Sequence, residues 1–201
     1  MIIGISGTHG TGKSTIVNAL SNWVQIDESQ ISRNAQKALG WEKLSIAGES
    51  VENMKALQEA ILAAMYDRDS KLVNNKDFII TERTPADVWA YTVMWCKRLG
   101  IDYTQDDWAK NYFGRCNEMA NKYSAFIVVP INSDIPFVVD PNRADLVSRE
   151  MVADIIDLFL DAHGEKVNRV FATGKNERAS ECLDIFHNIT FKHEKEQDSH
   201  D

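Results

Sequence analysis

The fold is decided by the stretch Gly7-Thr8-His9-Gly10-Thr11-Gly12-Lys13-Ser14-Thr15, which directly follows an apolar run at residues 2–6. It contains the pattern G-x-x-x-x-G-K-S between a predicted strand and a predicted helix. The glycines let backbone N–H groups approach phosphate oxygens, Lys13 adds a positive charge, and the Ser14 hydroxyl is a ligand for Mg²⁺. We therefore predict a phosphate-binding loop here, with ATP and Mg²⁺ as ligands and His9 as a loop residue rather than a general base.

Apolar runs that are typical of strands alternate with helical patterns along the chain. The runs are short and mostly continuous, as expected for strands covered on both faces: residues 2–6, 23–27, 78–81, 125–129 and 167–172. The helical patterns repeat apolar residues at a spacing near 3.6: residues 13–23, 51–73, 86–99, 104–122 and 146–162. This alternation predicts parallel βαβ units, and hence a three-layer α/β fold with a five-stranded parallel sheet.

Length, charge and cysteine content narrow the class of protein. The 201 residues suit a single domain, which we place at residues 1–191, with a charged, disordered tail at 192–201. Lys and Arg total 22 against 30 Asp and Glu, a net charge of −8, so we expect no stable binding of nucleic acid. The three cysteines match no disulfide or zinc spacing and should be reduced thiols. Neither a membrane-spanning run nor a secretory signal is evident, so we expect a cytoplasmic protein.

An acid and a base follow directly on one of the apolar runs, at Glu82 and Arg83. In an open parallel sheet the carboxyl ends of the strands face the ligand crevice, so both side chains are expected beside the phosphate-binding loop. There Glu82 would lie near Mg²⁺ and Arg83 near an anionic group of the ligand. The alternative is an exposed pair that only precedes the next helix.

Two further groups of residues are candidates for contacts with the sugar or base of a ligand. Asp27 and Glu28 follow another predicted strand, with Arg33 shortly after. An acid here can accept a hydrogen bond from a sugar hydroxyl or act as a base towards it, and the alternative is helix capping. Asp87 and Tyr91 lie on the predicted helix at residues 86–99. The helix dipole alone would justify Asp87, and Tyr91 either stacks on a base or belongs to the core.

A long stretch at residues 131–142 is mostly non-helical, and prolines lie beside it and within it. It leads into a predicted helix that carries Arg143 and Arg149 near its start. A loop that closes over phosphates and brings arginines to them has this layout, so we predict a mobile lid at about residues 131–149. The alternative is a surface loop with solvated arginines.

Taken together, these motifs resemble the P-loop kinases of nucleosides and nucleoside monophosphates, above all the thymidylate-kinase-like AAA_28 group of phages and bacteria. The resemblance covers residues 1–185. Its motifs are the loop at residues 7–15, Glu82-Arg83-Thr84 with Asp87 and Tyr91, and the lid Asp140-Pro141-Asn142-Arg143 with Arg149. A last segment, Phe171-Ala172-Thr173-Gly174-Lys175, resembles the part that borders adenine, which assigns Gly174 and Lys175 to ATP. Two departures are Pro141 in place of the usual Gly and Gln30 where the group often has Glu.

The resemblance implies an ATP-dependent phosphotransferase acting on a (deoxy)nucleoside monophosphate, a small-molecule acceptor that is first of all a pyrimidine or modified-pyrimidine deoxynucleotide. It implies catalytic roles for Lys13, Glu82, Arg83, Arg143 and Arg149. It assigns the metal to Ser14 and Glu82, and the acceptor to Asp27, Glu28, Arg33, Arg83, Asp87 and Tyr91. Three alternatives stay open: a nucleoside kinase, a kinase of hydroxymethyl-pyrimidine in DNA, and an NTPase or switch module without an acceptor. A homodimer is also left open, as is the host cytoplasm for a protein of phage origin.

Overall fold

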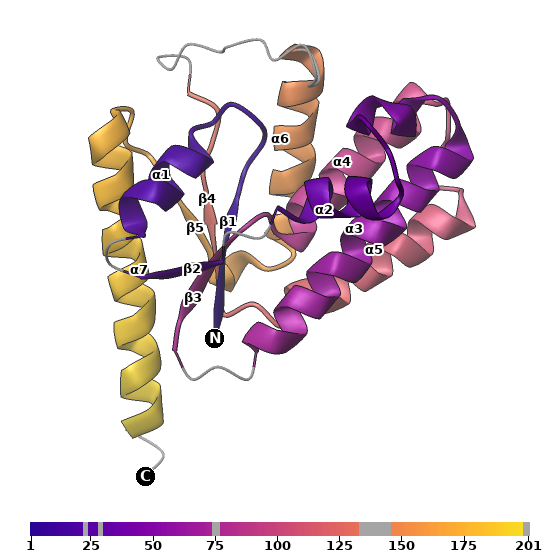
Figure 1. The fold of residues 1–201 in the computed structure, drawn as a ribbon. Helices are drawn as coiled ribbons and strands as arrows, with labels where there is room; N and C mark the ends of the chain where they lie inside the picture. The colour runs from indigo at the N-terminus through magenta and orange to yellow at the C-terminus, as the bar shows by residue number, and fades with distance from the viewer. Residues whose placement is uncertain (22–23, 28–29, 74–76, 133–145, 199–201) are drawn as a thin grey trace.

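The computed structural model describes residues 1–21, 24–27, 30–73, 77–132 and 146–198. Within this part of the chain, five strands form one parallel sheet in the order β2-β3-β1-β4-β5 (Figure 1). The strands are β1 (Ile2–Ser6), β2 (Gln25–Asp27), β3 (Ile79–Glu82), β4 (Ala125–Val128) and β5 (Val167–Arg169). Each falls on a predicted apolar run, so the parallel α/β sheet predicted from the sequence is confirmed.

Helices cover both faces of the sheet. In the described residues they are α1 (Lys13–Leu20), α2 (Ile31–Ala38), α3 (Val51–Leu72), α4 (Pro85–Arg98), α5 (Asp107–Ala120), α6 (Leu146–Asp161) and α7 (Lys175–Asp198). Two short 3-10 helices, η1 (Leu44–Gly48) and η2 (Gly164–Lys166), lie between them. Figure 1 shows α1 and α7 on one side of the sheet and α3 to α6 on the other. The predicted three-layer arrangement is therefore confirmed.

The sheet divides the core into two parts, and the pleat of β1 shows why its sequence is continuously apolar. Ile2 packs into the cluster under α3 to α6, whereas Ile3 and Ile5 pack into the cluster under α1 and α7. Successive side chains of a strand point to opposite faces, so a strand covered on both faces needs apolar residues at every position. All three isoleucines are fully buried.

The strand order places a crevice at the carboxyl end of β1. That strand lies between β3 and β4. The chain runs from β1 to β2 on one side of it, and later from β3 across to β4 on the other side. Ile5 pairs in register with Glu82 of β3, and Ser6 with Val128 of β4. The ends of the three central strands are therefore level, and the loops that follow them meet at one edge of the sheet, where open α/β sheets bind ligands.

The predicted disordered tail at residues 192–201 is corrected by the structure for most of its length. Helix α7 continues to Asp198, and the ring of His193 lies edge-on to Phe78 with 5.5 Å between ring centroids. Lys, Glu and Gln are good helix formers, so a charged composition is compatible with an exposed helix as well as with a disordered chain. Residues 199–201 lie outside the described part.

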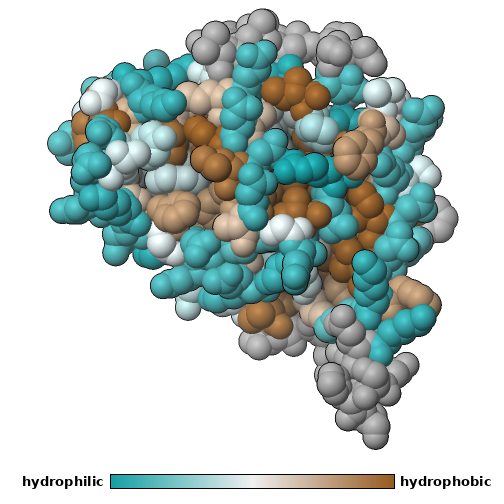
Figure 2. All heavy atoms as spheres, turned by 180° about the vertical axis from the view of Figure 1, so that it is seen from behind, coloured by the Kyte–Doolittle hydropathy of each residue, from teal (hydrophilic) through white to brown (hydrophobic). Residues whose placement is uncertain are grey.

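Figure 2 shows a face on which hydrophilic side chains predominate and hydrophobic ones occur in separate groups among them. Among the helices of the described residues, none combines the length and the apolar character that a membrane crossing requires.

The three cysteines should be unreactive in the folded protein. Cys96, Cys116 and Cys182 are free and fully buried. Burial raises the pKa of Cys96 to about 11 and that of Cys182 to about 12, and it raises the pKa of Cys116 as well. The reactive form is the thiolate, so at pH 8 we expect almost no reaction with a thiol reagent such as DTNB until the protein is denatured. Rapid labelling of a thiol in the native protein would contradict this packing.

Candidate active site

The phosphate-binding loop depends on glycine at two positions where the backbone requires it. Gly7 has φ 149°, and a Cβ atom there would lie 2.5 Å from the carbonyl oxygen of Val129. Gly12 has φ 88° in the left-handed region and forms the N-cap of α1. A side chain would strain the backbone at both positions and block the Gly7 position outright. The loop therefore has a fixed path from β1 into the N-terminus of α1, where N–H groups and the helix dipole favour an anion.

Lys13 crosses the loop from the first turn of α1. Its Nζ donates to the carbonyl oxygen of Gly7 and to that of Thr8, the latter at 2.7 Å. These bonds hold the ammonium over a cavity of about 260 Å³. The cavity is lined by Gly7, His9, Gly10, Thr11, Gly12, Lys13, Ser14, Thr15, Glu82, Arg83 and Tyr91. The loop and the end of β3, predicted from separate motifs, thus surround one space.

Two oxygen-bearing side chains, Ser14 and Glu82, lie side by side in this cavity. The Ser14 hydroxyl donates to Glu82 Oε1 at 3.1 Å. Both were predicted as metal ligands, and the structure brings them together from α1 and β3. A hydroxyl next to a carboxylate is a suitable pair of ligands for a hard divalent cation.

Arg83 has an unusual backbone conformation. Among the described residues it is the one non-glycine residue with a positive φ, at 71°. A non-glycine residue in this left-handed backbone region carries conformational strain of order 1–3 kcal/mol, and such strain often occurs at functional sites. The guanidinium of Arg83 lies over the ring of Tyr91, 5.5 Å from its centroid, and the Tyr91 hydroxyl is 3.1 Å from Nδ1 of His9. Tyr91 therefore forms a wall of the cavity and also packs against the core.

Asp87 has a different role from the predicted contact with a second nucleotide. The side chain is 1% exposed. Its Oδ1 accepts from the Gly7 N–H at 3.1 Å, and its Oδ2 accepts from the Ser6 hydroxyl at 3.0 Å and from the N–H and hydroxyl of Thr84 at 2.9 and 2.8 Å. Internal donors occupy both oxygens. Asp87 thus fastens the N-terminus of α4 to the start of the phosphate-binding loop, which corrects the predicted role.

Two buried arginines support the loop from behind. Arg149 on α6 donates to the carbonyls of His9 and Gly10 at 3.1 and 3.2 Å. Arg178 on α7 donates to the carbonyls of Thr11 and Pro130 at 2.7 and 2.8 Å. They are 6% and 2% exposed. Burial lowers the pKa of both guanidiniums, which nevertheless stay charged because arginine titrates so high. Two buried positive charges therefore lie behind the loop, although the whole chain is acidic.

Arg178 was missed by the sequence analysis, and Arg149 was assigned to the lid. Its partners Thr11 and Pro130 lie 167 and 48 residues away along the chain, so Arg178 carries no local sequence signal. Arg149 contacts loop carbonyls in this structure. The other predicted lid arginine, Arg143, and the stretch Asp140-Pro141-Asn142 lie outside the described residues, as does most of the predicted lid.

The remaining predicted residues lie around the site at different distances. Asp27 ends β2 and is 3.7 Å from Arg68, outside the cavity lining. Arg33 is exposed on α2, donates to Gln30 at 3.1 Å and does not line the cavity. Gly174 precedes α7, and its N–H donates to Glu177 at 3.2 Å. Lys175 begins α7, but its side chain is outside the described part, and so is Glu28.

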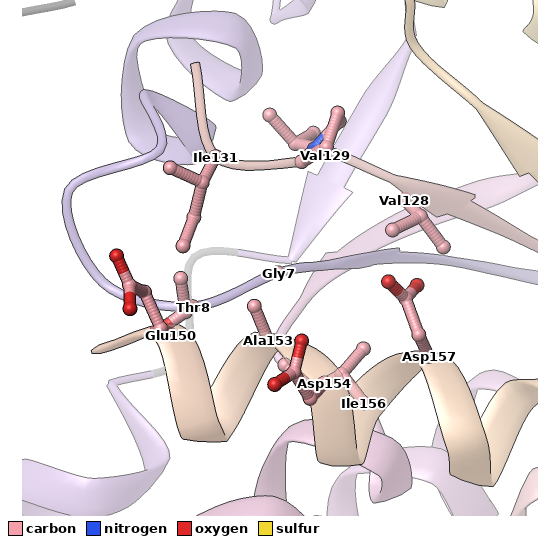
Figure 3. Close-up of a pocket in the computed structure, with 11 residues that line it drawn as sticks. Gly7, Thr8, Val128, Val129, Ile131, Glu150, Ala153, Asp154, Ile156 and Asp157 are labelled. Atoms are coloured by element: carbon pink, nitrogen blue, oxygen red, sulfur yellow. The ribbon is translucent and has the colours of Figure 1, made fainter. Parts of the chain in front are cut away.

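A second cavity of about 210 Å³ shares Gly7 with the first one (Figure 3). Its floor is α6, from which Glu150, Asp154 and Asp157 extend, and its roof is the end of β4 with the residues that follow it. Asp157 forms an ion pair with Arg169. The acidic lining makes this cavity unsuitable for phosphates, so the cavity around Lys13 is the candidate active site.

We expect the variant Arg178→Met to weaken nucleotide binding as well as stability. Methionine retains much of the packing but leaves the carbonyls of Thr11 and Pro130 without donors and removes a positive charge behind the loop. The affinity for ATP should fall about tenfold or more, which corresponds to about 1.4 kcal/mol. Titration with a fluorescent ATP analogue measures it.

Arg169→Met is the matched control for Arg178→Met. Arg169 on β5 forms ion pairs with Asp157 and Asp161, both of them on α6 rather than on the loop. This variant should lower the melting temperature and leave ATP affinity as in the wild type. Equal losses of affinity in both variants would contradict a specific support of the loop by Arg178.

Comparisons with known proteins agree with this geometry. The sequence matches the model of the family AAA_28, described as an AAA domain, over residues 2–178. A search of curated proteins gives no significant match. Similar solved structures include NadR in complex with NAD and AMP-PNP (TM-score 0.66, 14% identity, covering 94% of this chain and 49% of that chain). They also include NadR in complex with NR (TM-score 0.68, 14% identity, covering 94% of this chain and 51% of that chain). A third is thymidylate kinase from Candida albicans (TM-score 0.66, 17% identity, covering 93% of this chain and 91% of that chain).

The chain thus spans about half of the length of the NadR chains and most of the thymidylate kinase chain. At these identities the likeness shows a shared fold, and it confirms the P-loop kinase architecture predicted from the sequence.

Proposed function

The chain belongs to the AAA_28 family of AAA domains, and from this premise we propose that it transfers the γ-phosphoryl group of ATP to a small-molecule nucleotide. The proposed acceptor is a deoxynucleoside monophosphate, with a pyrimidine or modified-pyrimidine base. The observation that carries the proposal is the set of groups around one cavity: the phosphate-binding loop with Lys13, the Ser14–Glu82 pair, and the guanidinium of Arg83.

These groups supply what phosphoryl transfer needs. In the proposed reaction, an oxygen of the acceptor's phosphate attacks the γ-phosphorus, and the bond to the β–γ bridging oxygen breaks to release ADP. The transition state carries dispersed negative charge, so catalysis consists mainly of positioning and electrostatic stabilisation. Lys13 and the loop N–H groups hold the β- and γ-phosphates. Arg83 holds the acceptor's phosphate, because its fork of donors matches two phosphate oxygens.

Magnesium fits the pair formed by Ser14 and Glu82. A hydroxyl and a carboxylate within 3.1 Å of each other offer oxygen ligands at the edge of the phosphate site. Mg²⁺ bound with ATP would lie near both residues, Glu82 directly or through water, and would neutralise phosphate charge. Glu82 also keeps the Ser14 hydroxyl turned towards the cavity.

A monophosphate acceptor suits the residues better than a nucleoside does. A nucleoside hydroxyl needs a general base, for which Asp27 and Glu28 were the candidates, and of these the structure describes Asp27. Its carboxylate lies beside the buried Arg68 and outside the cavity lining. A monophosphate already carries an anionic oxygen and requires no base. The pyrimidine and deoxyribose preference rests on the family resemblance and on the fold shared with thymidylate kinases.

Further contacts complete the proposal. We assign adenine to the segment at Gly174 and Lys175, the base of the acceptor to the wall formed by Tyr91, and the catalytic arginine of the lid to Arg143, whereas Arg149 supports the loop through its carbonyls. Asp27, Glu28 and Arg33 are proposed to border the sugar of the acceptor. Asp87 is left out of the acceptor site because its oxygens are already bonded.

Label transfer from γ-³²P-ATP to a panel of acceptors tests the proposal. The panel contains the deoxynucleoside monophosphates, the corresponding nucleosides, and DNA with hydroxymethyl-pyrimidine. We expect label on a monophosphate, with a pyrimidine preferred. Label on a nucleoside or on DNA would mean that this molecule, and not a monophosphate, is the acceptor. Release of inorganic phosphate alone would identify an NTPase.

The variant Arg83→Lys should separate the two substrates. Lysine keeps the charge but lacks the planar fork that binds two phosphate oxygens at once. We therefore expect the KM for the monophosphate to rise about tenfold or more while the KM for ATP stays within about twofold. Initial-rate kinetics with each substrate varied in turn measure both constants. Equal increases in the two KM values would mean that Arg83 contacts ATP or has a purely structural role.

A further inference from the structure

A buried polar cluster lies directly beneath the strained residue Arg83, and none of its members belongs to a motif. Arg68 and Asp69 are on α3, and Tyr123 follows α5. Their side chains are 6%, 1% and 1% exposed. Arg68 Nε donates to Asp69 Oδ1 at 2.7 Å, its Nη2 to the Tyr123 hydroxyl at 2.8 Å, and that hydroxyl to Asp69 Oδ2 at 2.9 Å. A closed ring of charge-assisted bonds therefore fixes the guanidinium of Arg68.

The fixed guanidinium has two further donors, and both are aimed at the end of β3. Nη1 donates to the carbonyl of Glu82 at 3.2 Å, and Nη2 to the carbonyl of Arg83 at 3.3 Å. These carbonyls belong to consecutive residues at the point where φ of Arg83 is 71°. With negative φ at Arg83 the backbone would turn differently, and the two carbonyls would not both face one planar guanidinium. The bonds thus favour the left-handed conformation over the alternatives.

The same guanidinium also faces the neighbouring strand. Nη1 lies 3.7 Å from Oδ2 of Asp27 at the end of β2. Arg68 therefore ties the ends of β2 and β3 together from below. A buried charge pair is costly and is a poor means of stabilising a core, so its position under a strained backbone indicates a positioning role.

We propose that Arg68 is a positioning residue that holds Arg83 in its left-handed conformation and so aims the Arg83 guanidinium at the acceptor's anionic group. The inference rests on the proposed function, in which Arg83 binds the acceptor's phosphate. Arg68 touches no substrate, because it lies behind the backbone of Glu82 and Arg83 and does not line the cavity. Lys13, which holds the ATP phosphates in the proposed function, bonds instead to the carbonyls of Gly7 and Thr8.

The variant Arg68→Lys tests the proposal, with Tyr123→Phe as a milder second variant. Lysine keeps a charge beside Asp69 but cannot direct paired donors at two carbonyls. Phenylalanine removes the hydroxyl that orients Arg68 without removing any charge. In both variants we expect the acceptor KM to rise, about tenfold or more in Arg68→Lys, while the ATP KM stays within about twofold. Arg115→Lys is the matched control, since Arg115 also pairs with an acid on α3, Glu59, away from the site.

A second readout does not depend on turnover. The one-bond Cα–Hα coupling of Arg83, measured by NMR, distinguishes positive from negative φ. We expect it to report positive φ in the wild type and in Arg115→Lys, and a shift towards negative φ in Arg68→Lys. An unchanged coupling in Arg68→Lys, or equal increases in both KM values, overturns the proposal while leaving the proposed function intact. An inactive wild type overturns the proposed function and the acceptor part of the inference, and the coupling still decides whether Arg68 holds the backbone.

Discussion

Lys13→Ala should nearly abolish phosphoryl transfer while the protein stays folded. The ammonium of Lys13 is held over the phosphate site by the carbonyls of Gly7 and Thr8, where it can neutralise charge that develops on the β- and γ-phosphates. Loss of such a group costs on the order of 3 kcal/mol in the barrier, or more than about 100-fold in kcat. Single-turnover measurements at saturating ATP give this change directly.

Lys97→Ala is the control for Lys13→Ala. Lys97 lies exposed in the last turn of α4, and its removal should leave kcat unchanged. The fold of Lys13→Ala should be retained because the path of the loop depends on its glycines and on Asp87. A kcat within about threefold of the wild type would contradict a role of the phosphate-binding loop in catalysis, because such a change corresponds to less than about 1 kcal/mol in the activation barrier.

Asp87→Ala should cause the largest loss of stability among single changes near the site. It leaves the N–H groups of Gly7 and Thr84 and the hydroxyl of Ser6 buried without their acceptor. Each unsatisfied buried donor costs about 1–3 kcal/mol, so we expect a total of about 3 kcal/mol or more. For a chain of this size that lowers the melting temperature by about 10 °C. Calorimetry in the absence of nucleotide measures the shift.

Asp107→Ala provides the comparison for Asp87→Ala. Asp107 also lies in the first turn of a helix, α5, but its side chain is fully exposed. Its removal should cost less than about 1 kcal/mol, the usual contribution of a charge to the helix dipole. Equal shifts in the two variants would mean that Asp87 stabilises only its own helix and does not fasten the loop.

The features that could be predicted from the sequence are those that depend on residues close together along the chain. The phosphate-binding loop is a local motif. The bounds of β1 could be predicted from the apolar run that precedes this loop. Glu82 could be placed at the site because the carboxyl ends of parallel strands share one edge of the sheet. The strands at the edges are shorter than their apolar runs, because pairing with neighbours, rather than composition, decides where a strand ends.

The supports of the site could not be predicted in the same way. Arg178 reaches Thr11 from 167 residues away, and Asp87 reaches Gly7 from 80 residues away. Such contacts exist only once the sheet has brought distant helices together. The left-handed backbone of Arg83 runs against the preference of arginine, and it occurs where Arg68, from another element, donates to the Arg83 carbonyl. The charged end of α7 shows the opposite error, in which composition suggested disorder and the chain is helical.

Phosphorus NMR of the wild-type protein with ATP, Mg²⁺ and a pyrimidine deoxynucleoside monophosphate tests the central claim most directly, because each phosphate is followed separately. If the cavity around Lys13 and Arg83 transfers the γ-phosphoryl group, ADP and the deoxynucleoside diphosphate appear in equal amounts, and the signal of the monophosphate declines with them. ADP accompanied only by inorganic phosphate, with the monophosphate unchanged, would contradict the account.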